Sequence, residues 1–237
     1  MVNICVVGSR KGGVGKSTVA YELAHLLDAV LLDLEWDGGS VSRKWGYRAE
    51  DRVSDPLMAA INHQRTPRPL KGWRKPDLVP GSPDLIDAGV GSEQWADLVT
   101  AWAAEWGRDW VIVDTHPGAS ESAHGAMSIA NVICVPTALR TGDLDGAEQI
   151  VKEMGDYPIV LVPNMIHRVP PAAELARLER IVRGTPVRVG PPIPYVQKIE
   201  TRKRRMAMTA ENPSPKYLDR AVTAYRELGD YVKEYTS

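Results

Sequence analysis

The sequence has few cysteines, no phenylalanine and no long apolar run. Cys5 and Cys134 are the only cysteines among 237 residues, and each lies in an apolar run typical of a buried strand. Neither a disulfide framework nor a metal cluster is therefore expected. No apolar run approaches the roughly 20 residues that span a bilayer, and the apolar run at 4–7 is too short for a signal peptide. These absences predict a soluble, cytoplasmic protein.

The sequence also has no large excess of charge of either sign, because its formal net charge is −1. The charges are unevenly distributed. Residues 164–237 hold 14 Lys and Arg against eight Asp and Glu, whereas the preceding 163 residues hold 15 against 22. The protein is not a polycation, so any binding to nucleic acid has to come from a local patch.

Short apolar runs alternate with longer segments of helical period. The runs are at 4–7, 30–34, 110–113, 132–135 and 159–162, with a weaker one at 187–189. Helices are expected at 18–27, 56–62, 92–106 (with Ser92 as N-cap), 120–130, 143–154, 171–183 and 215–235. This pattern predicts an α/β fold with a mostly parallel central sheet and helices on both faces. No linker or repeat interrupts it, so a single domain over 1–237 is expected.

A glycine-rich loop follows the first predicted strand and precedes the first predicted helix. Its residues are Lys11, Gly12, Gly13, Val14, Gly15, Lys16, Ser17 and Thr18. The glycines allow positive φ and bring backbone N–H groups close to an anion, and the helix adds its N-terminal dipole. In such a loop Lys16 reaches the β- and γ-phosphates and the Ser17 hydroxyl binds Mg²⁺. The loop therefore predicts a nucleoside triphosphate site.

The loop departs from the strict Walker pattern, which has glycine where this chain has Arg10, and it carries a second lysine, Lys11. The string Lys-Gly-Gly-Val-Gly-Lys-Ser-Thr resembles the deviant Walker A motif of the ParA/MinD ATPases, to which the nitrogenase iron protein and arsenical pump ATPases also belong. The resemblance implies a P-loop NTPase of the deviant Walker A type that uses ATP and Mg²⁺. It also implies an ATP-dependent homodimer in which Lys11 reaches the partner's phosphates.

Two acidic strand ends extend the resemblance. The segment Leu31-Leu32-Asp33-Leu34-Glu35-Trp36-Asp37 is similar to the family's first switch, Asp-x-Asp-Pro-Gln. By this match Asp33 belongs to the metal site, and Glu35 is the catalytic acid that positions the attacking water or the metal shell. Glu replaces Asp, and Trp-Asp replaces Pro-Gln, so the geometry of hydrolysis differs from the family pattern. The alternative interpretation is a solvated acidic turn.

The second acidic strand end, at 110–118, resembles the Walker B strand and second switch, Asp-Thr-Pro-Pro. Asp114 then holds Mg²⁺ through water, and Gly118 lets the loop move. His116 stands at a proline position of the family, where it is either catalytic or an exposed loop histidine without a role. Weaker matches are the segments 78–82 and 135–137, the latter followed by Asp143.

The end of the strand at 159–162 resembles the place where the family sets an asparagine against adenine. Asn164 is the candidate base reader, together with Met165 and the backbone near Pro194. An asparagine at a strand-to-loop junction is also simply a good turn residue.

The densest cationic run lies near the C-terminus and comprises Lys198, Arg202, Lys203, Arg204 and Arg205. In ParA proteins this region holds DNA without sequence preference, so the resemblance implies non-specific DNA binding. The other interpretation is a solvated helix face. Arg177, Arg180 and Arg183, spaced i, i+3 and i+6, are candidates to widen the patch. No basic amphipathic tail of the MinD kind follows, so no membrane binding is expected.

The resemblance implies a nucleoid-associated partition ATPase with a ParB-like partner protein. Catalysis would draw on Lys16, Glu35, Asp114 and the partner's Lys11. The main rival is a MinD-like positioning switch that does not bind DNA. A dethiobiotin-synthetase-like enzyme lacks a recognisable acceptor motif here, a nitrogenase-type reductase is disfavoured because both cysteines are strand residues, and a non-hydrolysing nucleotide-binding module remains open because of Glu35.

Overall fold

Strands and helices alternate along the chain in a computed structural model that describes residues 1–37, 41–51 and 55–237. The strands are β1 (Asn3–Val7), β2 (Val30–Leu34), β3 (Asp77–Val79), β4 (Trp110–Thr115), β5 (Val132–Thr137), β6 (Ile159–Pro163) and β7 (Arg188–Val189). The helices are α1 (Lys16–Leu26), α2 (Val41–Trp45), α3 (Pro56–Asn62), α4 (Ser92–Trp106), α5 (Glu121–Ser128), α6 (Thr141–Met154), α7 (Ala172–Val182), α8 (Gln197–Glu200) and α9 (Asp219–Tyr235).

The described strands form one sheet of seven, in the order β3-β2-β4-β1-β5-β6-β7. All neighbouring strands run parallel, which confirms the predicted fold class. In the register of the sheet Asp114 of β4 lies opposite Asp33 of β2 and Val7 of β1. Carboxyl ends of parallel strands share one edge of the sheet, and functional groups of open α/β sheets gather there. The fold therefore brings the two predicted acids beside the glycine-rich loop.

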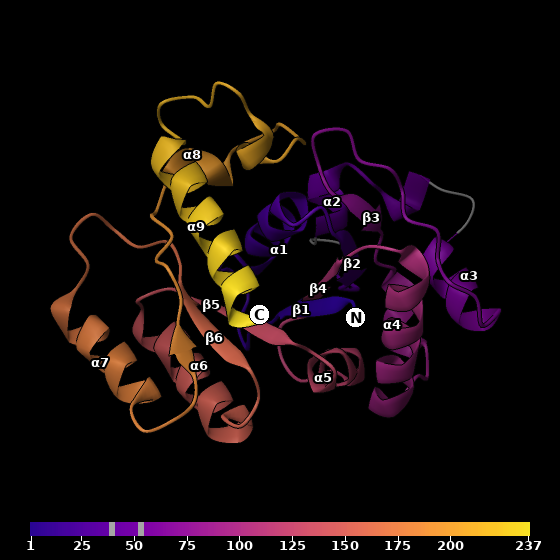
Figure 1. Cartoon of the computed structure of the whole chain (residues 1–237), viewed down its shortest axis with the longest axis horizontal. Coiled ribbons are helices and arrows are strands. Elements are labelled where there is room, and N and C mark those ends of the chain that lie inside the picture. The colour runs from indigo at the N-terminus through magenta and orange to yellow at the C-terminus, as the bar shows by residue number, and fades with distance from the viewer. Residues whose placement is uncertain (38–40, 52–54) are drawn as a thin grey trace.

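Helices cover both faces of the sheet. Figure 1 shows α1, α2, α8 and α9 above the sheet and α4, α5, α6 and α7 below it. Side chains of β1 alternate between the two cores: Cys5 and Val7 pack with α1 and α9, whereas Ile4 and Val6 face α4 to α7. Among the described residues, no helix combines the length and apolar character that crossing a membrane requires.

Most of the predicted helices and strands are present, but some of them begin or end at other residues than predicted. Ser92 is not the N-cap of α4, because Gly91 holds that position and the Ser92 N–H donates to a carboxylate oxygen of Glu121 at 2.8 Å. The cap is thus supplied by the start of α5, a contact that local sequence does not reveal. The last helix begins at Asp219 rather than at 215, since Leu218 N–H closes a turn onto the Pro215 carbonyl first. Cys5 and Cys134 are buried free thiols on adjacent strands.

A buried glutamate ties the C-terminal segment to α1. The Glu22 carboxylate is fully buried and accepts hydrogen bonds from the N–H groups of Met208 and Thr209 at 2.9 and 3.0 Å. It also accepts one from the Thr209 hydroxyl at 2.9 Å. One side chain thus fixes the path of the chain between the basic run and α9.

We expect Glu22→Ala to lower the free energy of unfolding by about 3 kcal/mol, because three buried donors lose their acceptor. Urea denaturation followed by circular dichroism measures this change. Glu22→Gln keeps one acceptor oxygen and should lose less. Glu227→Ala, at an exposed position of α9, is the matched control. An unchanged midpoint for Glu22→Ala would contradict the assigned tether.

Candidate functional site

The glycine-rich loop leads from β1 into α1 with the backbone that anion binding requires. Gly13 and Gly15 have φ values of 80° and 84°, which side-chain-bearing residues rarely adopt. Gly15 is the N-cap of α1, so the free N–H groups of the first helical turn face the loop. A helix N-terminus preceded by such glycines is a site for a phosphate group.

Lys16 points from the first turn of α1 to the two acidic strand ends. Its ammonium group donates to Asp114 Oδ1 at 2.9 Å and contacts Glu35 Oε1, and only 5% of the side chain is exposed. Burial would lower the pKa of Lys16, but the charges of Asp114 and Glu35 outweigh it and raise that pKa above its ordinary value. The lysine therefore stays charged and joins β2 and β4 to the loop.

Glu35 is the second acid of the site and is also buried. Burial raises its pKa to about 7, although the positive charge of Lys16 opposes this shift. A carboxyl group with such a pKa exchanges protons near neutral pH, as a general base must. Glu35 thus has the protonation behaviour for the role that the resemblance implies.

Asp33 organises the loop after β2. Its Oδ1 accepts from the Glu35 N–H at 3.0 Å, and its Oδ2 accepts from the Ser42 N–H at 3.1 Å and from the Ser42 hydroxyl. Asp33 is fully buried. Its carboxylate therefore shapes the first switch besides being a candidate metal ligand.

Carboxylate oxygens of Asp33, Glu35 and Asp114 lie within 4.8 Å of one another. Asp114 Oδ2 is buried and has no hydrogen-bond partner in the described part of the chain. Oxygen donors of this kind suit Mg²⁺, and a buried carboxylate oxygen without a partner is where a hydrated cation fits. The structure thus brings Asp33 and Asp114 together as expected and adds Glu35. Ser17, the third expected ligand, is half-buried beside Lys16 at the start of α1.

Asn164 lies against the glycine-rich loop. Its Nδ2 donates to the Val14 carbonyl at 2.7 Å, and its Oδ1 accepts from the Met165 N–H at 2.9 Å. A Cβ on Gly15 would stand 2.3 Å from that Nδ2, so this contact also requires glycine at position 15. A backbone bridge between Ile166 and Pro194 brings the segment near 194 to the same place. In this structure Asn164 braces the loop, a role that the sequence did not indicate.

Lys11 lies on the surface at the other side of the loop. Its ammonium group is 2.5 Å from the position that a Cβ of Gly142 would take, at the start of α6. The neighbouring Arg10 pairs with Glu153 of the same helix. Lys11 is accordingly exposed, whereas Lys16 is buried.

Lys44 is a second cation close to the loop, and the sequence did not single it out. Its ammonium group donates to the Thr18 hydroxyl at 2.9 Å and lies 5.5 Å from the centroid of the Tyr21 ring. Burial lowers its pKa to about 8. Lys44 lies several residues after the first switch, and no local sequence pattern indicates that its side chain contacts Thr18.

Trp36 and His116 stack on each other, joining the two switch loops. Their ring centroids are 3.8 Å apart and the planes differ by 17°. Burial lowers the pKa of His116, so the ring is neutral at pH 7. His116 therefore has a structural contact, and the interpretation of an exposed histidine without a role is wrong. Trp36 and His116 both stand where the sequence departs from the family pattern, and this departure was the sequence signal that could have indicated their contact.

The C-terminal basic run divides into buried and exposed members. The side chain of Arg202 is only 7% exposed and pairs with buried Glu211. Contrary to the prediction, Arg202 therefore does not contribute to a basic surface. Lys203, Arg204 and Arg205 are exposed, although Arg204 also pairs with Glu211 at 3.0 Å. Lys198 is exposed, with its ammonium group 4.8 Å from the Tyr217 ring centroid.

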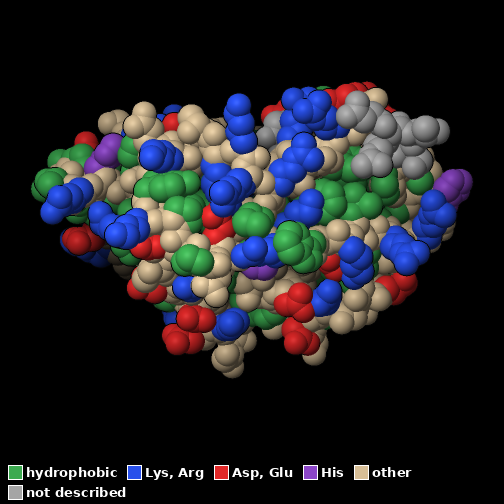
Figure 2. All heavy atoms as spheres, turned by 90° about the horizontal axis from the view of Figure 1, so that it is seen from above, with side chains coloured by type: hydrophobic (Ala, Val, Ile, Leu, Met, Phe, Trp, Pro, Cys, Tyr) green, Lys and Arg blue, Asp and Glu red, His purple; other side chains and the backbone are tan. Residues whose placement is uncertain are grey.

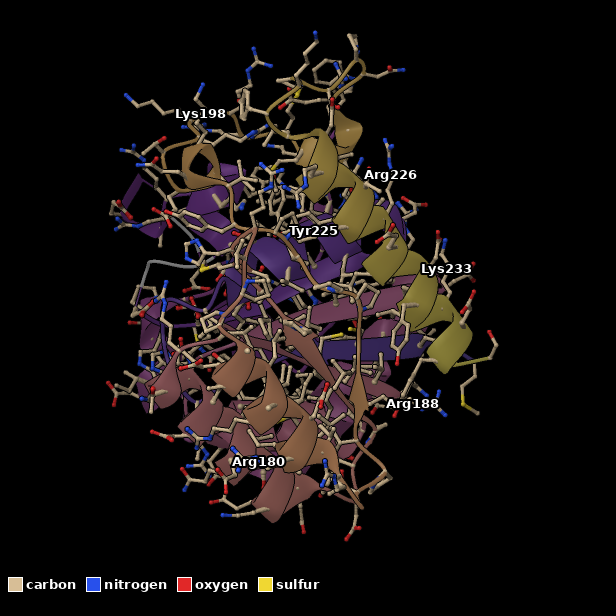
Figure 3. All side chains as sticks on the ribbon, turned by 90° about the vertical axis from the view of Figure 1, so that its left-hand side faces the viewer. Arg180, Arg188, Lys198, Tyr225, Arg226 and Lys233 are labelled. Atoms are coloured by element: carbon tan, nitrogen blue, oxygen red, sulfur yellow. The ribbon has the colours of Figure 1, made fainter. Side chains whose placement is uncertain are left out.

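The proposed widening of this patch by α7 does not occur. Figure 3 places Arg180 near the opposite end of the molecule from Lys198. Arg177 pairs with Asp145 and Glu148 of α6, so its charge is compensated. The charge pattern of α7 serves helix packing, a use that helical spacing alone cannot distinguish from ligand binding.

We expect His116→Ala to release the contact between the switches and lower the free energy of unfolding by about 1 kcal/mol, as for other stacked ring pairs. Hydrogen exchange should rise in peptides containing 35–37 and 115–118. His116→Phe keeps a flat ring and should restore both values. Equal exchange in the Ala variant and the parent would show that the stack does not order these loops.

Comparison with known proteins gives consistent relatives. No protein-family model matches the chain. It is 27% identical over 169 residues to the chromosome-partitioning ATPase Soj of Thermus thermophilus, covering 67% of this chain and 64% of that protein. It is 26% identical over 162 residues to the chromosome partitioning protein ParA of Myxococcus xanthus, and 24% over 193 residues to an iron–sulfur cluster carrier protein of Aquifex aeolicus. These matches span 56% and 49% of the two proteins, so the chain spans about half to two thirds of the length of these three relatives.

Solved structures share the fold over nearly the whole chain. An ATP complex of Cyanothece McdA has a TM-score of 0.73 at 16% identity, with 99% of this chain and 96% of that chain covered. MinD of Pyrococcus horikoshii with Mg-ADP has a TM-score of 0.74 at 19% identity, covering 99% and 97%. The MinC:MinD complex of Aquifex aeolicus gives 0.75 at 18%, covering 98% and 96%. The sequence relatives support the resemblance to the ParA/MinD ATPases, and the solved structures show that the chain has the fold of these proteins.

Proposed function

We propose that this protein is an ATP-hydrolysing switch that dimerises on ATP, binds DNA without sequence preference and drives partition of a replicon or other cargo. The observation that carries the proposal is the buried cluster of Lys16, Glu35 and Asp114 at the mouth of the glycine-rich loop. The partition proteins among its relatives support the cellular role.

The loop and its neighbours would hold the nucleotide. Backbone N–H groups of residues 12–18 and the ammonium group of Lys16 would bind the phosphates, and the segments at Asn164, Met165 and Pro194 would contact the base. Ser17, Asp33 and Asp114 supply oxygen atoms for Mg²⁺, which neutralises phosphate charge when bound. The fully buried Asp114 carboxylate, with its unpartnered oxygen, is the strongest of these candidates.

Hydrolysis needs a group that orients water towards the γ-phosphate. Glu35 now pairs with Lys16 and would be released when phosphate oxygens replace it as the partner of that lysine. The freed carboxylate would then accept a proton from the attacking water. The exposed Lys11 would complete the second copy's site by stabilising charge on the γ-phosphate. Hydrolysis thus requires both the dimer and a freed Glu35.

Three substitutions separate these roles. Lys16→Ala should abolish nucleotide binding, whereas Lys11→Ala should bind ATP but fail to dimerise or hydrolyse it. Glu35→Gln should bind ATP, form the dimer and lose at least about 100-fold in hydrolysis rate, the scale of a lost catalytic base. Nucleotide titration, light scattering and phosphate release measure the three properties. Lys233→Ala, exposed at the end of α9, is the control. Unchanged hydrolysis in Glu35→Gln would exclude Glu35 as the base.

DNA binding is tested with the purified protein without nucleotide, with ADP, and with ATP and Mg²⁺, across a salt series. We expect sequence-independent binding with ATP that weakens steeply with salt and is lost in Lys203→Ala/Arg204→Ala/Arg205→Ala. Addition of a ParB-like partner should then raise hydrolysis and release the DNA. Absence of binding in every nucleotide state, with ATP dimerisation intact, would favour a positioning switch like MinD.

The iron–sulfur carrier among the relatives does not change this proposal. A shared cluster needs accessible thiolates. The chain's two cysteines, Cys5 and Cys134, are both completely buried within the sheet. Cluster carriage is therefore not proposed for this protein.

A further inference from the structure

Residues 63–76, between α3 and β3, form a second basic segment that the nucleotide site does not use. The segment contains five cations and no acidic residue, namely Arg65, Arg68, Lys71, Arg74 and Lys75. Its end is anchored by paired hydrogen bonds between the backbones of Leu70 and Leu78, at 2.7 and 2.9 Å. The segment is therefore held to the β3 edge of the sheet in a defined position.

Tertiary contacts bring this segment to the C-terminal basic run. The Ala207 N–H donates to the Arg74 carbonyl at 2.9 Å, and the Arg74 guanidinium donates to the Ala210 carbonyl. Burial lowers the pKa of Lys75, and the nearby charge of Arg205 lowers it further. Figure 1 shows the two segments side by side at the top of the molecule. Two basic runs, more than 120 residues apart in sequence, thus share one surface.

Trp73 stands in this surface with 78% of its area exposed. The Arg74 guanidinium carbon lies 5.6 Å from the centroid of its ring. Figure 2 shows the face from above, where many Lys and Arg side chains and some Asp and Glu side chains lie among hydrophobic areas. At this exposure most of the indole ring is accessible to a partner.

Two acidic residues beside these cations are already paired, whereas Glu200, three residues before Lys203, is exposed. Glu211 is buried and pairs with Arg202 and Arg204, and Asp77 pairs with Lys71 and Arg108. Arg205, Lys203 and Arg204 remain exposed. The surface therefore keeps a positive charge that complements a polyanion.

We propose that residues 71–75 and 203–205 form one DNA-binding surface, in which the exposed cations of 203–205 hold phosphates and Trp73 contacts a base or sugar. This inference rests on the proposed DNA binding and adds a second chain segment and an aromatic contact to it. A flat ring among cations fits nucleic acid, whose bases offer stacking faces beside the phosphates. Lipid insertion requires several exposed apolar side chains together. Trp73 is the one exposed large hydrophobic residue within the fully described stretches 63–76 and 198–210.

The two kinds of contact respond differently to salt. Each phosphate contact contributes about −0.9 to the slope of log K against log salt, because it releases a counterion from the DNA. A stacked ring releases none, so it contributes affinity without changing the slope. A base–aromatic contact is worth about 5- to 150-fold in affinity.

The experiment measures fluorescence anisotropy of a labelled DNA duplex and of a labelled single strand, whose base faces are accessible to a ring, with the full chain, ATP and Mg²⁺, over about 50 to 200 mM salt, the range in which such binding changes strongly. We expect Trp73→Ala to weaken binding of the single strand at least about 5-fold at every salt concentration with the slope unchanged, and Trp73→Phe to recover part of the loss. Lys203→Ala should instead flatten the slope for the duplex by about 0.9. Tyr157→Ala, which removes another exposed aromatic ring before β6, is the matched control and should bind like the parent. Thermal unfolding verifies that each variant is folded.

The outcomes separate this inference from the proposed function. If Trp73→Ala binds DNA like the parent while Lys203→Ala/Arg204→Ala/Arg205→Ala does not, the proposed function stands and the composite surface is overturned. If the parent protein does not bind DNA in any nucleotide state, both are overturned. The parent protein and the Trp73→Ala variant are also tested for binding to vesicles containing phosphatidylglycerol. Vesicle binding that depends on Trp73, without DNA binding, would assign the surface to a membrane and overturn the inference.

Discussion

The buried ammonium group of Lys16 is the interaction on which the rest of the site depends. Taking a cation and two carboxylates out of water is costly, and only their mutual pairing makes the arrangement stable. Glu35 and Asp114 come from different strands, and the parallel register places those strand ends next to each other. One charge thus connects α1, β2 and β4. A nucleotide phosphate, as an anion, would compete with these carboxylates for the same lysine.

Contacts between neighbouring loops hold the surroundings of the cluster in place. Asn164 braces the glycine-rich loop through the Val14 carbonyl, and the Gly118 N–H joins the second switch to the Ser9 carbonyl at 2.9 Å. The Trp36–His116 stack joins the two switches. A ligand that binds one arrangement of these loops more tightly than another shifts the population towards that arrangement. This organisation suits the proposed switch, in which the nucleotide state is transmitted to a distant surface.

Polar contacts hold the C-terminal basic run in place. They pair some of its charges with buried acids and leave other charges exposed. Glu22 holds residues 208–209 against α1, and Glu211 neutralises Arg202 within the C-terminal segment. Arginines with buried partners stabilise the fold, because an unpaired charge at such a position would be costly. The cations left exposed, such as Lys203, are those a ligand can reach. A count of basic residues cannot separate these two groups.

The sequence by itself determined the parallel α/β fold, the phosphate loop and the two acidic strand ends. Each follows from local order along the chain: apolar runs of strand length, glycines before a helix, and an acid directly after a buried run. Only the tertiary structure decided that Asn164 braces the loop, that Lys44 returns to Thr18, that His116 stacks on Trp36, and that Arg202 is buried. It also joined residues 71–75 to the C-terminal basic run. These outcomes depend on which segments pack together, because contacts between residues far apart in sequence leave no periodic pattern within either segment.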